Sequence, residues 1–141
     1  MSACGYDQTY VIFNKSNKRN LMKKLKCHCG AIEASINVPE NLDKVLRCNC
    51  SLCKRKGAVM SMIKKENFTI IKGEDKLKLY QFHTKIAKHY FCSICGIYTH
   101  HNPRSNPAMT GFNLGCLDEI DTLNLNDILI NDGHNHPLDK K

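Results

Sequence analysis

Short apolar runs with alternating polar positions are the main pattern of the chain. In residues 31–38 every second side chain is apolar, which predicts a strand with one buried face, formed by Ile32, Ala34, Ile36 and Val38. Pro39 and Asn41 then predict a turn, and residues 44–47 a second, shorter strand.

Four further runs rich in Val, Ile, Tyr and Phe are separated by charged or Gly-containing turns, and they cover residues 58–63, 67–73, 76–82 and 85–91. Such runs predict antiparallel strands. The one helical feature is a single turn before Gly57, for which Ser51 is the expected N-cap. No long helical period interrupts the pattern, so we predict a mainly β fold with one or two short helical turns.

The composition indicates one domain that needs support beyond apolar packing. The chain has 141 residues, 42% of them hydrophobic but only 7% aromatic, with no Trp, and a metal site often stabilises so small a core. We expect a basic leader and first strand in residues 1–25, a central metal-stabilised domain in 26–118 and an acidic extension in 119–141. Neither a secretory signal nor an apolar stretch of membrane-spanning length is visible, which favours a cytoplasmic protein without a membrane partner.

Nine cysteines, an odd number grouped in close pairs, are better explained by metal than by disulfides in a reducing compartment. The first pair is Cys27 and Cys29, and its partner is the pair Cys92 and Cys95. Both pairs are followed directly by Gly, which allows the backbone turn of a zinc knuckle. Four thiolates complete a tetrahedron, so these residues predict a closed, structural zinc site.

A second group contains Cys48, Cys50 and Cys53, whose spacing brings three sulfurs to one ion. No fourth cysteine is near in sequence. Three protein ligands are typical of a catalytic zinc, whose remaining position takes water or an incoming thiolate. The alternative is a second structural site completed by a distant residue, for which the candidates are His28, His89, His100 and Cys116.

The remaining cysteines and histidines carry weaker signals. We interpret Cys4 as incidental and Cys116 as a small buried hydrophobe. Because neighbouring residues of a strand face opposite ways, at most one of His100 and His101 points into a pocket. The histidines of residues 134–136 are interpreted as part of a tail.

The order of the three cysteine groups, with Gly73, Tyr80 and the segment HYFCSICGIYTHH, resembles the family of glutathione-dependent formaldehyde-activating enzymes, which includes centromere protein V. The resemblance runs from about Lys26 to Asp118, with a weaker match at Asp132-Gly133. It implies a zinc-binding β-tent of antiparallel sheets. It also implies the same division of the seven cysteines into a structural set of four and a reactive set of three.

The resemblance further implies a carbon-sulfur lyase that joins glutathione to formaldehyde or a related small aldehyde, with two Zn²⁺ per chain. In that case Lys54 and Arg55, in the basic run 54–56, are candidate contacts for the glutathione carboxylates, although a solvated helical turn explains them equally well. The zinc-thiolate chemistry does not specify the carbonyl, so other electrophiles stay open.

A different class of function also stays open, namely a non-catalytic two-zinc module that contacts nucleic acid or an acidic protein. Its basis is the net charge of +8 and the basic residues 14–26 and 54–56. Seven thiolates on two Zn²⁺ would reduce that charge by about three units. No reading helix and no dense aromatic and basic surface supports this alternative.

Overall fold

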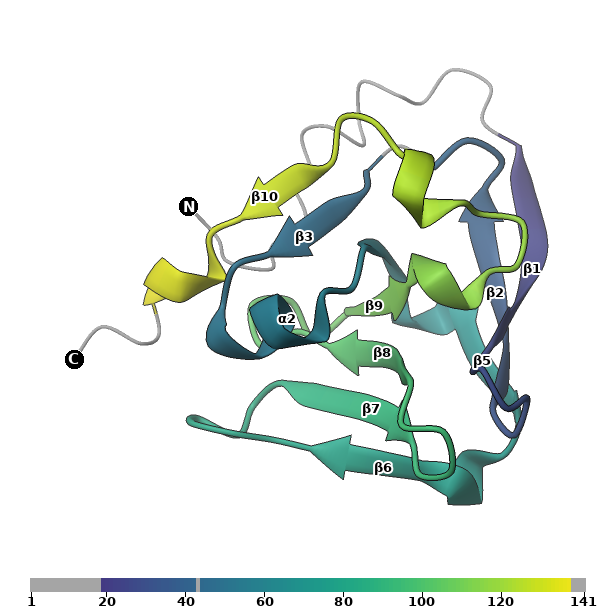
Figure 1. The fold of residues 1–141 in the computed structure, drawn as a ribbon, viewed down its shortest axis with the longest axis horizontal. Helices are drawn as coiled ribbons and strands as arrows, with labels where there is room; N and C mark the ends of the chain where they lie inside the picture. The colour runs from purple at the N-terminus through teal and green to yellow at the C-terminus, as the bar shows by residue number, and fades with distance from the viewer. Residues whose placement is uncertain (1–18, 43, 138–141) are drawn as a thin grey trace.

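The structure is a computed structural model that describes residues 19–42 and 44–137. Two β-sheets form its framework, and the mainly β class predicted from the sequence is confirmed. Figure 1 shows the small sheet at the right and the large sheet running across the molecule from β6 to β10.

The small sheet has the strand order β1-β2-β5, with bounds Asn20–Lys26, Glu33–Pro39 and Phe68–Lys72. Its strands are all antiparallel. The alternation predicted for residues 31–38 is confirmed, because Ile32, Ala34, Ile36 and Val38 are all fully buried.

The large sheet has the order β10-β3-β4-β9-β8-β7-β6. In chain order its strands are β3 (Leu46–Cys48), β4 (Met60–Lys64), β6 (Leu77–Tyr80), β7 (Lys88–Cys92), β8 (Tyr98–Asn102), β9 (Met109–Asn113) and β10 (Leu129–Asn131). The pairing is antiparallel except at one edge, where β10 lies parallel to β3. This edge brings the C-terminal part of the chain beside the strand that ends at Cys48.

Four of the predicted runs became β4, β5, β6 and β7, and the strand predicted at 44–47 is β3, shifted by about two residues. The chain does not place them in one consecutive meander. The run at 67–73 pairs with β2 in the small sheet, which separates it from β4 and β6 in space.

The main core lies between the two sheets. Leu25 and Ile36 from the small sheet share one cluster with Ile63 and Phe112 from the large sheet. Apolar burial of this kind stabilises the packing of the sheets by roughly 1.5–3 kcal/mol per large side chain. A smaller cluster surrounds Cys27 and Cys92, so the first cysteine group is itself part of the interior.

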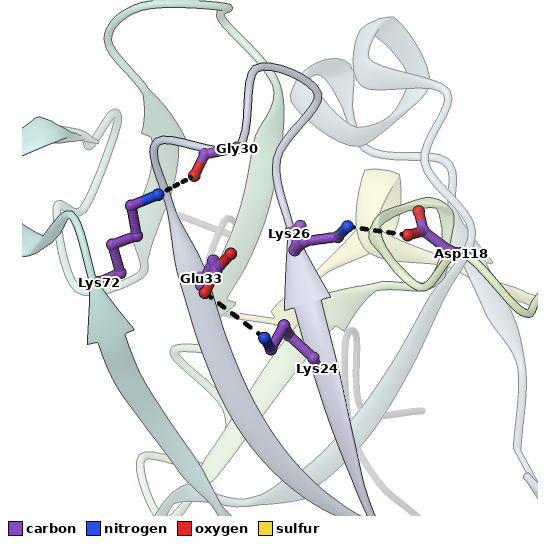
Figure 2. A network of polar contacts seen from close by, with 6 residues as sticks. All are labelled: Lys24, Lys26, Gly30, Glu33, Lys72 and Asp118. Carbon is purple, nitrogen blue, oxygen red and sulfur yellow. Dashed lines mark hydrogen bonds and ion pairs between the residues drawn. The ribbon is translucent and has the colours of Figure 1, made fainter.

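The basic residues of β1 have carboxylate partners. Figure 2 shows Lys26 bound to Asp118 at 3.0 Å and Lys24 beside Glu33 at 3.8 Å, and Lys23 contacts Glu119 at 3.0 Å. These pairs neutralise part of the basic run 14–26 on which the nucleic-acid or acidic-protein alternative was based, and residues 14–18 of that run lie outside the described residues. The same figure shows Lys72 donating to the carbonyl of Gly30, which ties β5 to the turn after β1.

The helical turn predicted before Gly57 is α2 (Ser51–Lys56), but its N-cap differs from the prediction. Cys50, not Ser51, is the capping residue, and its Sγ accepts from the backbone N–H of Cys53 at 3.3 Å. Gly57 ends the helix as expected, with φ 65° and its N–H bound to the carbonyl of Cys53. The predicted cap was misplaced by one residue because a thiol is not among the usual capping groups.

Candidate metal sites and the adjoining cavity

Four cysteines from two distant turns meet in one cluster, formed by Cys27, Cys29, Cys92 and Cys95. Their sulfurs all lie within 4.8 Å of one another. The Sγ of Cys29 is 3.7 Å from that of Cys27 and 3.7 Å from that of Cys92. A disulfide needs about 2.05 Å, whereas a tetrahedron with Zn–S bonds of about 2.3 Å has edges of about 3.8 Å. The spacing therefore fits a shared zinc ion.

The backbone around this four-cysteine cluster has the knuckle geometry that the two Cys-Gly pairs predicted. Gly30 and Gly96 have φ of 80° and 77°, and each donates its N–H to the carbonyl of the first cysteine of its pair, Cys27 and Cys92. The N–H of Ile32 also points at the Cys27 sulfur, at 3.2 Å. Amide donors of this kind stabilise thiolate charge. The donor set and its surroundings thus suit a structural metal.

The second cluster is built where β3 meets α2. Strand β3 carries Cys48 at its end, the cap of α2 is Cys50, and Cys53 lies inside the helix. The three sulfurs lie within 4.8 Å of one another. The N–H of Cys53 and the side-chain amide of Asn131 both point at sulfurs of this three-cysteine cluster, at 3.3 and 3.7 Å.

No fourth metal-binding side chain joins the three-cysteine cluster among the described residues. Of the four candidates named from the sequence, His28 is exposed beside the other cluster. His100 contacts Thr99 Oγ1 at 2.8 Å and stacks on Tyr90, away from the cluster. Cys116 is buried, as predicted, and its thiol donates to a backbone carbonyl. Only His89 reaches the neighbourhood of the three sulfurs.

A cavity of about 310 Å³ adjoins this cluster, and Cys50 and Cys53 form part of its wall. Imidazole rings supply much of the remaining wall, from His83, His89, His101, His134 and His136, with Phe82 and Arg104 nearby. Thiols and histidines from four separate segments therefore face one space. Lys54 and Arg55 do not line it. They are exposed on α2, where the Arg55 guanidinium donates to the carbonyl of Ser51 at 2.8 Å.

His89 is held by a lysine from the helix that carries Cys53. The ammonium of Lys56 lies 3.2 Å from His89 Nδ1 and 3.6 Å from the centre of the Tyr98 ring. Burial, reinforced by the Lys56 charge, lowers the pKa of His89 to about 4. The ring is neutral near pH 7, and because an ammonium only donates, Nδ1 accepts and the ring proton is on Nε2.

His101 stacks on His89 with ring centres 5.5 Å apart and is itself held by Tyr98, whose hydroxyl is 2.5 Å from His101 Nδ1. Burial and the Lys56 charge hold the pKa of His101 well below its usual range. We assign the hydroxyl as donor to Nδ1, because this contact is much shorter than the 3.6 Å contact of the same hydroxyl with the Met60 sulfur. The proton of the neutral ring is then on Nε2, an atom with no hydrogen-bond partner among the described residues.

The position of His101 depends on a glycine in the neighbouring strand. Gly111 pairs with His101 across β8 and β9, and a Cβ there would lie 2.2 Å from the imidazole ring. The expectation that His100 and His101 face opposite ways is confirmed, but the prediction that at most one of them points into a pocket is wrong, because both side chains are buried and each lines a pocket of its own. His101 lines the cavity, whereas His100 points to the opposite side of the sheet, against Phe68 and Tyr90.

The histidines near the C-terminus were wrongly interpreted as tail residues. His136 is 4% exposed and lines the cavity, as does His134. Gly133 packs so closely on the three-cysteine cluster that a Cβ there would lie 2.4 Å from Cys48 Sγ. In the sequence, the one sign that this segment belongs to the site was the Asp132-Gly133 pair. Strand β10 is three residues long and mostly exposed, so it has no strong apolar pattern that would predict it.

The fold and the site define a mainly β protein with two cysteine clusters that could hold metal ions, one beside a histidine-lined cavity. The sequence matches the family named GFA, glutathione-dependent formaldehyde-activating enzyme, over residues 22–128. The chain belongs to this family.

A solved structure supports the same assignment. It is the crystal structure of a Rhodobacter sphaeroides protein, a Northeast Structural Genomics target, which is 39% identical and superposes with a TM-score of 0.72. The match covers 76% of this chain and 98% of that one. Within the part of the chain that the structure describes, no helix is long and apolar enough to cross a membrane.

Proposed function

We propose that this chain is a zinc-dependent enzyme of the carbon-sulfur lyase type that adds the thiol of glutathione to formaldehyde or a related small aldehyde. One observation carries the proposal. Cys50 and Cys53 face a cavity of about 310 Å³, while the described residues give their cluster three thiols and no fourth ligand. Catalytic zinc sites commonly have three protein ligands and leave one position to water or substrate. The four-cysteine cluster, in contrast, suits a structural zinc.

The proposed reaction needs a thiolate and a place for the charge that develops on oxygen. When bound to Cys48, Cys50 and Cys53, a zinc ion would supply positive charge that favours the thiolate form of glutathione. Attack by this sulfur forms the S–C bond, and the π pair of the carbonyl moves to oxygen. The oxygen gains one proton, which balances the proton lost by the thiol.

Two neutral imidazoles in the cavity wall are suited to stabilise that oxygen. His89 and His101 carry their protons on Nε2, because Lys56 and Tyr98 occupy their Nδ1 atoms. An N–H donor fixed before the reaction begins stabilises developing negative charge without reorganisation. Removing one such donor typically costs about 10²–10³-fold in kcat.

The cations around the cluster fit an anionic substrate. Three thiolates and Zn²⁺ have a net charge of −1, and the Lys56 ammonium, beside His89 and Tyr98, offsets it. Lys54 and Arg55 remain the proposed contacts for the glutathione carboxylates because both are exposed on α2, next to the cavity wall at Cys53. Arg104, in the cavity wall, is a further candidate.

The test is the rate of S-hydroxymethylglutathione formation, measured by NMR on protein of known zinc content. Zinc-loaded protein should exceed the spontaneous rate, and Cys50→Ser should return the rate to the spontaneous value. Cys116→Ser, at a described cysteine that belongs to neither cluster and whose donor to the Tyr98 carbonyl a serine can keep, is the matched control and should behave as the unaltered protein. A spontaneous rate from fully zinc-loaded protein, with formaldehyde and with other small aldehydes, would refute the enzymatic function.

A further inference from the structure

The segment that follows the family match contacts the three-cysteine cluster directly. The match ends at residue 128, and β10 begins at Leu129. Strand β10 pairs with β3 so that Asn131 lies opposite Cys48. The backbone then continues past the cluster as a 3₁₀ turn, η5 (Gly133–Asn135). In Figure 1 this segment is yellow, and its strand β10 lies beside β3.

Two residues of the segment fix the position of Cys48. The side-chain amide of Asn131 points at Cys48 Sγ from 3.7 Å. Gly133 lies so close that a Cβ would be 2.4 Å from this sulfur and 2.9 Å from Cys50 Cβ. Real Cβ atoms do not approach other atoms to such distances, so any larger residue would displace a thiol from the cluster or push the segment away.

A polar network fastens the segment to the loop between Cys48 and Cys50. Asn49 donates from its side chain to Asp132 at 3.1 Å, and its Oδ1 accepts from the backbone N–H of His134 at 2.9 Å. The backbone N–H of Asn49 is bound to the carbonyl of Asn131 at 3.1 Å. Hydrogen bonds donated by the side chains of Asn135 and, with a smaller effect, Asn49 lower the pKa of Asp132. The side chain of Asn49 therefore connects the loop between Cys48 and Cys50 to both Asp132 and His134.

The same segment closes one side of the cavity. Gly133, His134 and His136 all line it, together with Cys50 and Cys53. His136 is 4% exposed, so its ring is part of the interior. The wall that faces the thiols is thus partly built from residues that follow the matched range 22–128.

We propose that residues 129–136 form the specificity-determining wall of the reactive site. Gly133 and Asn49 are positioning residues that hold Cys48 in ligand geometry, and the His136 ring limits the size of the aldehyde that enters. The role of His136 rests on the proposed function, whereas the role of Gly133 and Asn49 concerns only metal retention.

The first experiment measures zinc per chain and its release to a colorimetric chelator. Gly133→Ala should reduce the content from two ions to about one, with far-UV circular dichroism unchanged. Gly115→Ala, the same change at an exposed glycine with ordinary φ and a nearest contact of 3.2 Å, is the matched control and should retain both ions. Two zinc ions in Gly133→Ala, released at the unaltered rate, would overturn the positioning role.

A second variant covers the case in which Gly133→Ala disturbs folding. Asn49 is exposed, so Asn49→Ala removes the network without altering the core. It should release one of the two zinc ions at least about tenfold faster, which corresponds to the loss of about 1.4 kcal/mol. Release of both ions at the unaltered rate would count against the proposal whatever the enzymatic activity.

The cavity wall is tested by His136→Ala with aldehydes of increasing size. The variant should keep two zinc ions and shift the ratio of kcat/KM for a C3 or C4 aldehyde over formaldehyde upward by about tenfold or more, because the removed ring enlarges the cavity. An unchanged ratio with measurable turnover would overturn the specificity role. Absence of turnover in the unaltered protein would instead refute the proposed function, and the zinc measurements would still decide the positioning role.

Discussion

At the scale of single residues, the chemistry of the cavity depends on which ring nitrogen of each histidine is occupied. Lys56 occupies Nδ1 of His89, and Tyr98 occupies Nδ1 of His101. Gly111 leaves room for the second ring where any other residue would collide with it. The unusual feature is His101 Nε2, a buried polar atom without a partner among the described residues. Such an atom costs about 1–3 kcal/mol of stability, and under the proposed function a substrate oxygen that reaches the ring would offset this cost.

Replacing that donor should slow the chemistry without loss of metal. His101→Phe is expected to lower kcat by about 10²-fold with a much smaller change in KM, because the donor acts on charge that develops in the transition state. Steady-state kinetics at equal zinc content are the measurement. His100→Phe makes the same change at a buried histidine on the opposite side of β8 and should leave kcat within about twofold. Equal kcat values for the two variants would contradict this role for His101.

At the scale of secondary structure elements, α2 couples a helix cap to a metal ligand. The Cys50 sulfur accepts from the N–H of Cys53, so one atom both begins the helix and belongs to the three-cysteine cluster. Three residues after it, Cys53 places its own thiol in the cluster, and one turn of helix is enough to align the two. Gly57 then ends the helix in the left-handed conformation. This short helix therefore sets the positions of two thiols relative to one another.

This double role separates two substitutions that are usually treated as equivalent. Cys50→Ser and Cys50→Ala both remove the thiolate, but serine keeps a capping oxygen and alanine does not. We expect Cys50→Ala to have a free energy of unfolding about 1 kcal/mol lower than that of Cys50→Ser. Urea denaturation of the two variants at equal zinc content measures the difference. Equal values would show that the sulfur does not stabilise the helix as a cap.

The sequence predicted elements better than it predicted their partners. Period-two alternation revealed the buried face of β2 because one side of that strand meets a core and the other meets solvent. It could not show that β5 joins the small sheet, since strand pairing depends on contacts distant in sequence. The polar strand β8 has four buried residues, two of them histidines, and its sequence lacks an apolar signal for that reason. Cysteine spacing predicted both clusters, but not the cavity wall contributed by His136.

At the scale of the whole molecule, the two clusters occupy different structural contexts. The four-cysteine cluster joins the turn after β1, in the small sheet, to the turn after β7, in the large sheet. The contact between Cys29 and Cys92 spans 63 residues of sequence. The three-cysteine cluster comes from one short stretch of chain, from the end of β3 into α2. Its own ligands therefore join no parts of the fold that are distant in sequence.

A cross-link lowers the entropy of the unfolded chain, and this stabilises the folded state by about 4 kcal/mol for a loop of that length but only about 2 kcal/mol for a loop of a few residues. The same reasoning applies to a metal bridge, because it restricts the unfolded chain in the same way. Loss of metal from the four-cysteine cluster should therefore release the two sheets from one another, whereas loss from the three-cysteine cluster should leave the fold intact.

Chelation should then proceed in two phases. The first zinc equivalent, from Cys48, Cys50 and Cys53, should leave quickly, because two of these thiols line an accessible cavity, and the far-UV circular dichroism should not change. The second, from a cluster with four thiols that joins the two sheets, should leave slowly and together with the loss of sheet signal. Zinc release and circular dichroism followed in the same sample test this order. Cys48→Ser should lack the fast phase and keep the slow one, and unfolding that accompanies the first equivalent would show that both clusters support the fold.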